Sequence, residues 1–252
     1  MDLELKKMNK VVAFDFDDTL AMTDSLIGIS TLLPINLVDV MTAAGIAHKK
    51  VTGKYLWIDS CNYERLESLG IASRLQVVFD YCQTLSVNVE SAKPIFSMIQ
   101  TMQAALAEPL TKVVIITARA GYSSIWSESL QTKVASTNRE GILSFLRIHD
   151  VEIHDDDLYT VGDVAESGGD TAAAKAEVLA KYAKMYPTAE IVFYDDSKRN
   201  INAALSLPVA YGIKNPVTVH MIKHGKVIVT ERVSHKIRIK QRLDSIFKCI
   251  ME

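Results

Sequence analysis

Four short apolar runs divide the chain into the alternating pattern of an α/β protein. They lie at residues 10–14, 112–116, 158–161 and 191–194. Their β-branched and aromatic content favours buried strands over helices. Apolar residues recur at spacings of three and four over residues 91–106 and 171–185, which predicts two helices, the second capped by Asp170. Because strands that alternate with such helices form βαβ units, we predict a three-layer, Rossmann-like parallel sheet.

Residues 23–90 interrupt this alternation and are too many for a structureless connection. Their pattern predicts helices over residues 30–44 and 63–85 and an extended segment over 53–58. We therefore expect a small, mainly helical cap or flap inserted after the first strand.

The remaining residues, 1–22 and 91–252, would form the catalytic core, with residues 214–252 as a basic strand and helix extension. Within that extension, residues 217–222 are strand-like. From Lys214 to Lys248 the chain holds nine basic and two acidic residues, and residues 150–170 hold eight acids. Both stretches are typical of solvated surfaces, although the basic one could also attract a polyanion.

Composition narrows the class of protein further. The 252 residues are 48% hydrophobic with a formal net charge of −2, which excludes wholesale disorder. Three scattered cysteines form no CxxC pair, so we expect neither a disulfide framework nor a zinc site. The chain has no run of about 18 apolar residues, and its first apolar run is too short for a signal peptide. We expect no membrane span and a cytoplasmic location.

The sharpest motif is VVAFDFDDT at residues 11–19, where a buried strand ends in three carboxylates. Open α/β sheets bind ligands beyond the carboxyl ends of their strands. Asp15 and Asp17 lie two residues apart, and extended backbone would place them on one side. Because neighbouring carboxylates repel, a hard divalent cation such as Mg²⁺ is the expected remedy. An N-cap or turn cluster is the structural alternative.

A second strand, residues 191–194, also runs into paired acids, Asp195 and Asp196. If the two strands are neighbours, four carboxylates converge, which is more than a helix cap requires. Asp163 and Asp170 also follow a strand and are a weaker rival for the distal acid site.

Hydrogen-bond donors follow a third strand, where Thr117, Ala118 and Arg119 come after residues 112–116. A hydroxyl and a guanidinium both suit a phosphoryl group, although a plain strand-to-loop junction explains them nearly as well. Lys175 lies in the helix before the second acid pair, and Lys181 and Lys184 are its rivals.

In this order the motifs DFDDT, ITAR, a lysine and DD resemble the haloacid dehalogenase (HAD) superfamily of phosphotransferases. The match covers about residues 10–22 and 92–212. The resemblance implies a sheet in which the Asp15 strand is central, between the Thr117 and Asp195 strands. A dehalogenase would not need an acid at the position of Asp17. The presence of Asp17 therefore favours phosphatase over dehalogenase chemistry within this family.

The resemblance implies a role for each motif residue. Asp15 would be the nucleophile that forms an aspartyl-phosphate, and Asp17 the general acid and base. Thr117 would hold phosphoryl oxygens, with Thr19, Ala118 and Arg119 as further phosphate or substrate contacts. Lys175 would balance negative charge. The Mg²⁺ site would include Asp15, Asp17 (through its backbone carbonyl), Asp195 and Asp196.

The expected activity is Mg²⁺-dependent phosphomonoester hydrolysis on a phosphorylated metabolite, a nucleotide or a nucleic-acid end. Tyr55, Trp57, Tyr63 and Arg65 of the insert could stack on a leaving group, or they could simply pack a small core. The alternatives are a non-catalytic protein that binds a phosphate ligand and nucleic-acid binding through residues 214–248. The sequence leaves the oligomeric state open.

Overall fold

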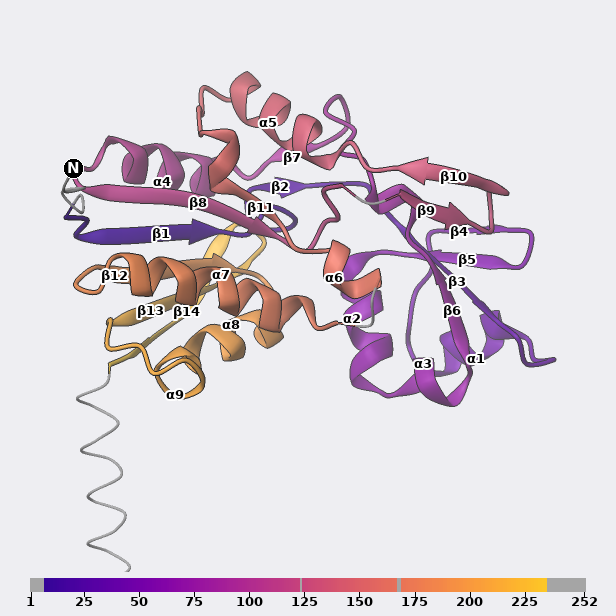
Figure 1. The fold of residues 1–252 in the computed structure, drawn as a ribbon. Coiled ribbons are helices and arrows are strands. Elements are labelled where there is room, and N and C mark those ends of the chain that lie inside the picture. The colour runs from indigo at the N-terminus through magenta and orange to yellow at the C-terminus, as the bar shows by residue number, and fades with distance from the viewer. Residues whose placement is uncertain (1–6, 123, 167–168, 235–252) are drawn as a thin grey trace, which may run out of the picture. The chain divides into compact units, whose positions relative to one another are not determined.

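The computed structural model describes residues 7–122, 124–166 and 169–234 and divides the chain into two units (Figure 1). The first unit contains Met1–Met22, Lys93–Ala118 and Ile142–Glu252, and the second contains Thr23–Ala92 and Arg119–Gly141. The insert expected at residues 23–90 therefore corresponds to most of the second unit. Residues 119–141, which the sequence pattern assigned to the core, belong to the second unit as well.

A six-stranded sheet organises the first unit. Its strands are β1 (Lys10–Phe14), β8 (Thr111–Thr117), β11 (Leu158–Thr160), β12 (Glu190–Asp195), β13 (Val217–Lys223) and β14 (Lys226–Val233). They lie in the order β11-β8-β1-β12-β13-β14, and only β14 runs antiparallel to its neighbour. The predicted parallel sheet is confirmed, with β1 between β8 and β12.

Helices pack on both faces of this sheet (Figure 1). The helices of the first unit are α4 (Phe96–Ala107), α5 (Asn138–Ile148, from Ile142 onward), α6 (Asp163–Glu166), α7 (Thr171–Met185), α8 (Lys198–Leu205) and α9 (Leu207–Ala210), with a 3-10 turn η2 (Asp155–Asp157). Residues of α7, α8 and α9 share one buried apolar cluster with β1, β8, β12 and β13. On the opposite face Phe16 meets Phe145 of α5 edge to face, with ring centroids 5.4 Å apart.

The strand β1 shows why a continuous apolar run marks a central strand. Val11 and Ala13 belong to the cluster under α7 and α8, while Val12 and Phe14 point to the other face, and all four are buried. Two covered faces leave no position for a polar residue until the strand ends. The helix α7 begins where predicted, because Asp170 Oδ1 accepts a hydrogen bond from the Ala172 amide at 2.8 Å.

The tip of the β13–β14 hairpin packs against the start of α4. Gly225 has a positive φ of 72°, and a Cβ there would lie 2.7 Å from Cγ2 of Ile95. Its carbonyl accepts a hydrogen bond from Ser97 Oγ at 2.6 Å. The Ile95 amide in turn donates to the carbonyl of Leu20. The short strands β2 (Ala21–Met22) and β7 (Lys93–Pro94) pair with each other; β2 directly follows Leu20 in the sequence, and β7 directly precedes Ile95.

The second unit contains an antiparallel sheet as well as short helices, so the expectation of a mainly helical insert is not confirmed. The sheet order is β4 (Lys50–Thr52), β5 (Tyr55–Ile58), β3 (Ile27–Thr31) and β6 (Val77–Asp80). The other elements are α1 (Leu37–Ala43), α2 (Ser60–Ser68), α3 (Ile71–Arg74), the 3-10 turn η1 (Cys82–Thr84) and the hairpin β9 (Ser124–Ser127) with β10 (Thr132–Ala135).

The predicted helix over residues 63–85 ends early for a local reason. Gln76 takes a positive φ of 48°, which interrupts the helical backbone after α3. The β-branched and aromatic residues that follow pair with β3 as strand β6. Tyr63 packs edge to face on Phe79, and Tyr55 and Trp57 are buried together in a small cluster. These rings pack the unit's own interior.

Two remaining expectations concern the chain as a whole. Among the helices that the structure describes, none is both long enough and apolar enough to cross a bilayer. The basic stretch of residues 214–248 contributes β13 and β14, and its part from residue 235 onward lies outside the described residues.

Candidate active site

Acidic side chains from two neighbouring strand ends meet at the carboxyl edge of the six-stranded sheet. Phe14 lies opposite Tyr194 in the parallel register of β1 and β12, so Asp15 comes beside Asp195. The Asp15 amide donates to the Tyr194 carbonyl at 2.9 Å, which extends the pairing by one residue. Carboxylate oxygens of Asp15, Asp195 and Asp196 all lie within 4.8 Å of one another.

A buried lysine lies between two of these carboxylates. Lys175 Nζ is 2.8 Å from Oδ1 of Asp15 and 2.9 Å from Oδ2 of Asp195, and its side chain is 2% exposed. It projects from the first turns of α7, whose start Asp170 caps. Its sequence rivals lie elsewhere, because Lys181 and Lys184 are exposed and Lys181 Nζ donates to the hydroxyl of Tyr159.

The Asp195 carboxylate is held in place by donors on both oxygens. Oδ1 accepts hydrogen bonds from the Ser197 amide and from Asn200 Nδ2, each at 2.9 Å. Oδ2 accepts from Asn200 Nδ2 at 3.0 Å as well as from Lys175. In the described residues no hydrogen-bond donor is recorded for the Asp196 carboxylate. Sequence reasoning missed Asn200, although the DDSKRN run places an amide one helical turn after the acid pair.

The electrostatics show that this cluster lacks positive charge. Burial, with the negative charges of Asp195 and Asp17, raises the pKa of Asp15 to about 7 despite Lys175. Burial, together with Asp15, Asp195 and Asp18, raises the pKa of Asp196 to about 9. Burial alone would lower the pKa of Lys175, but Asp15 and Asp195 outweigh it and raise that pKa. One lysine therefore does not neutralise a cluster of two buried carboxylates and one half-buried carboxylate.

The loop after β1 is a tight turn that presents the rest of the DFDDT motif. The Phe16 carbonyl accepts hydrogen bonds from the amides of Leu20 and Ala21, and the Asp18 amide donates to the Ala21 carbonyl. Asp18 adopts a positive φ of 55° to make this turn. Asp17 is half-buried and lies outside the three-acid cluster, but its charge acts on Asp15.

Two threonine hydroxyls of the predicted site are fully buried. Thr117 is the last residue of β8, and Thr19 follows the acidic turn. Thr19 Oγ1 has no hydrogen-bond partner among the described residues. A buried hydroxyl without a partner carries a desolvation cost, which a bound ligand or water could offset. Ala118, next after β8, is exposed.

Arg119 belongs to the second unit, and its contacts there are extensive. Its Nη1 donates to the carbonyls of Thr84 and Ser86 and to Oδ1 of Asn138, each at 3.1 Å. Its Nη2 donates to the hydroxyl of Thr23 at 3.0 Å and to the hydroxyl of Ser25 at 2.8 Å, and both residues belong to the same unit. These bonds join three segments of the unit, and a substrate-binding role for Arg119 stays a prediction.

The rival acid site of the sequence analysis is not assembled in this way. Asp170 caps α7 and forms an ion pair with Arg199 at 2.9 Å, and Asp163 begins α6. The hydrogen bond to the Ala172 amide and the charge of Arg199 outweigh partial burial and lower the pKa of Asp170. Neither residue belongs to the three-acid cluster.

Comparisons with known proteins give only a weak structural similarity. No protein-family model matches the chain, and no curated protein sequence matches it. Two solved structures, both of the HAD domain of the effector protein Lem4 from Legionella pneumophila, are similar to it. One is 13% identical and covers 88% of this chain and 91% of its own, and the other, an inactive mutant, is 12% identical and covers 88% and 89%. Both have a TM-score of 0.34. A likeness of this size says nothing about substrate or activity.

Proposed function

We propose that this protein is a Mg²⁺-dependent phosphohydrolase of the HAD type, which cleaves phosphomonoesters through Asp15. The observation that carries the proposal is the buried ion-pair bridge from Asp15 through Lys175 to Asp195. This bridge joins the end of a DFDDT strand to the end of the neighbouring strand, with Asp196 alongside. A helix cap or turn would need neither the lysine nor three converging carboxylates.

The residues present fit a hard divalent cation. Three carboxylates with oxygens within 4.8 Å offer the donor type that Mg²⁺ prefers. The raised pKa values of Asp15 and Asp196 reflect burial and unbalanced negative charge. Asp15 and Asp196 would be the direct side-chain ligands, because Asp195 already accepts hydrogen bonds on both oxygens. Asp17 would contribute its backbone carbonyl. When bound, Mg²⁺ would reduce the repulsion between the nucleophile and an anionic phosphoryl group.

The proposed reaction has two displacement steps. Asp15 attacks phosphorus and forms an acyl-phosphate bond, while the bond between phosphorus and the leaving oxygen breaks. Asp17 gives its proton to that oxygen, so the alcohol leaves neutral. Asp17 then takes a proton from water, which attacks the aspartyl-phosphate and releases inorganic phosphate and Asp15. Lys175 keeps Asp15 in position and offsets charge, and Thr117 would hold phosphoryl oxygens.

We propose a phosphorylated metabolite, a nucleotide or a phosphorylated nucleic-acid end as the substrate class. The alternative is a protein that binds a phosphate ligand on the same scaffold without turnover. The two differ in what they require of Asp17, because a binding protein has no use for a proton donor beside the nucleophile.

The test is phosphate release from p-nitrophenyl phosphate and from a panel of phosphorylated metabolites, nucleotides and oligonucleotides, with Mg²⁺ and with EDTA. We expect turnover that is lost in Asp15→Asn, in Asp17→Asn and on chelation. Asp170→Asn is the matched control, since asparagine caps a helix as well as aspartate does, and it should retain activity. Retained turnover in Asp15→Asn would contradict the proposal, and ligand binding without any turnover would favour the alternative.

A further inference from the structure

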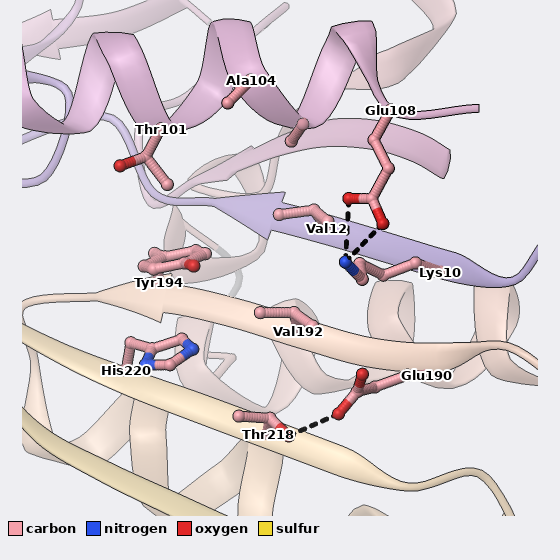
Figure 2. A pocket seen from close by; sticks show the side chains of 11 residues that line it. Lys10, Val12, Thr101, Ala104, Glu108, Glu190, Val192, Tyr194, Thr218 and His220 are labelled. Carbon is pink, nitrogen blue, oxygen red and sulfur yellow. Dashed lines mark hydrogen bonds and ion pairs between the residues drawn. The ribbon is translucent and has the colours of Figure 1, made fainter. Parts of the chain in front are cut away.

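A groove of about 370 Å³ lies between α4 and the strands β1, β12 and β13 of the first unit (Figure 2). Its charged side chains already have partners. Lys10 pairs with Glu108 at 2.8 Å, and Glu190 accepts a hydrogen bond from Thr218 and pairs with Arg232 at 3.2 Å. The second unit differs from this groove, because it contains buried hydrogen-bond donors that have no acceptor among the described residues.

These donors lie on one face of the four-stranded sheet of the second unit. Tyr55 and Trp57 alternate with Leu56 and Ile58 along β5, and side chains two residues apart in a strand share a face. Leu56 and Ile58 belong to the apolar cluster that includes residues of α1 and α2. Tyr55 and Trp57 therefore project to the other face, where their ring centroids lie 6.3 Å apart.

Both rings carry a polar atom that the described chain leaves without a partner. The Tyr55 hydroxyl and Trp57 Nε1 are buried and have no hydrogen bond there, and each residue is only 3% exposed. Buried phenol and indole groups normally find a partner, because an unpaired donor loses its hydration without compensation. Two such donors at alternate positions of one strand point to an acceptor that is not part of the chain.

Two lysines bring positive charge to the same rings. Lys50 lies opposite Trp57 in the pairing of β4 with β5, and its Nζ is 5.1 Å from a ring centroid of Trp57. Lys54 Nζ is 5.5 Å from the ring centroid of Tyr55. Both lysines are exposed, and no carboxylate of the described residues forms an ion pair with either. This end of the face therefore has a surplus of positive charge.

The other end of the face is acidic, and its acceptor is already occupied. Gly28 of β3 lies opposite Trp57, and Asp80 of β6 lies opposite Gly28. A Cβ at Gly28 would lie 3.2 Å from the Trp57 ring, so glycine leaves room for the indole over β3. The Asp80 carboxylate accepts hydrogen bonds from the amides of Cys82 and Ser129, each at 3.0 Å. An anion on this face would therefore be held at the lysine end.

We propose that this face of the second unit binds a small organic oxyanion, a phosphate ester or a carboxylate, through Lys50, Lys54, the Tyr55 hydroxyl and Trp57 Nε1. Phosphate and carboxylate oxygens share the required chemistry, because they accept hydrogen bonds and carry the charge that the lysines attract. The lysine side chains over the rings are long and exposed, so they can move to admit the ligand. The site lies within the second unit and does not depend on the activity proposed for Asp15.

Fluorescence of Trp57 in the full chain tests the proposal. The chain has two tryptophans, and Trp126→Phe, at an exposed position of β9, leaves Trp57 as the only one. Inorganic phosphate, glycerol 3-phosphate and citrate are titrated in EDTA, with sodium chloride at matched ionic strength as the control. We expect a saturable change with an oxyanion and none with chloride. Comparison of the phosphates with citrate identifies the preferred class.

Two lysine variants locate the binding site. Lys50→Gln should weaken the Kd for the oxyanion by roughly tenfold, because a hydrogen bond to a charged group is lost. Lys133→Gln removes an exposed lysine of β10 in the same unit and is the matched control. It should leave the Kd unchanged.

Thermal melts give a second measurement. Because the Tyr55 hydroxyl has no partner among the described residues, Tyr55→Phe should melt no lower than the parent chain in buffer without oxyanions. Saturating oxyanion should raise the melting temperature of the parent chain by several degrees, since the ligand binds the folded state. The gain should be smaller in Tyr55→Phe.

Three outcomes would overturn the proposal. A fluorescence response equal to that of chloride would mean that the face has no specific anion site. An equal drop in melting temperature for Tyr55→Phe with and without oxyanion would mean that the hydroxyl serves the fold alone. A response kept in Lys50→Gln and lost in Asp15→Asn would assign the anion to the acidic strand ends of the first unit. Failure to release phosphate from any substrate, by contrast, would count against the phosphohydrolase and leave this site unaffected.

Discussion

Each of the two units has a strongly basic side chain buried among its described residues, and the two differ in the partners that surround them. Lys175 of the first unit lies between the carboxylates of Asp15 and Asp195. Arg119 of the second unit binds backbone carbonyls, hydroxyls and an amide oxygen. Among the described contacts, the lysine balances charge at strand ends, whereas the guanidinium ties segments of chain together. The difference lies in the partners, because both side chains are almost fully buried.

Among the variants considered, substitution of Lys175 should cause the largest loss, and the loss should be in the rate of phosphomonoester hydrolysis. In Lys175→Met, we expect hydrolysis of p-nitrophenyl phosphate to fall by roughly 10³-fold or more, since Asp15 and Asp195 lose their shared counter-charge. Steady-state kinetics measure the loss. Lys181→Met, on the exposed side of the same helix, is the matched control and should keep near-normal rates.

Substitution of Arg119 should act on stability. Arg119→Met leaves several buried oxygens of the second unit without a donor, so we expect unfolding free energy to fall by about 3 kcal/mol. Hydrogen exchange should rise around residues 84–86 and 138 and stay unchanged in β1 and β12. If Arg119→Met instead raises KM and leaves the unfolding free energy unchanged, Arg119 binds substrate. Its role would then not be mainly structural, in contrast to what its contacts predict.

A smaller effect is expected from Asn200, which orients Asp195. Asn200→Ala removes donors from both oxygens of that carboxylate. Metal affinity should fall by about 10- to 100-fold, in line with other residues that orient metal-site ligands. Calorimetric titration with Mg²⁺ measures this affinity. Asn202→Ala on the same helix is the control, and an unchanged affinity in Asn200→Ala would mean that the Asn200–Asp195 hydrogen bonds do not position the metal ligands.

The smallest effect should be a pH-dependent shift in melting temperature. The folded pKa values of Asp15 and Asp196, about 7 and about 9, lie above the ordinary value of 3.8. Between those limits the folded state holds protons that the unfolded state has lost, so stability in EDTA should fall as pH rises from 5 to 8. Saturating Mg²⁺ should reduce this fall, by several degrees in thermal melts at pH 8. Parallel curves with and without Mg²⁺ would contradict the metal site.

The sequence predicted the core of the fold closely because its signals are local. A buried central strand must be apolar throughout, so β1 could be placed to the residue, and an aspartate cap fixed the start of α7. The nearness of Asp15 and Asp195 followed from strand order, which the resemblance to a known family supplied. Lys175 had only a weak signal of its own, since a lysine on an alanine-rich helix is usually exposed.

The second unit was harder to predict because its order depends on contacts between distant segments. Strand β6 became a strand by pairing with β3, some fifty residues earlier, after Gln76 broke the helix. The role of Arg119 as a hub needed residues from three parts of the chain, which no spacing rule connects. Asn200 lies close to Asp195 in the sequence, so distance along the chain does not explain why it was missed. An asparagine one helical turn after a strand is common in any α/β protein, and its position therefore gave no specific signal.

The contact at Gly225 limits how this protein can diverge. Its backbone touches the start of α4, and the residue before that helix supports the loop that follows Asp15. In related chains the hairpin tip should therefore tolerate changes at its exposed neighbours, whereas any side chain at residue 225 would push the helix start toward the acidic loop. Substitutions at the tip of this hairpin would thus be limited by the need to keep the loop after Asp15 in place.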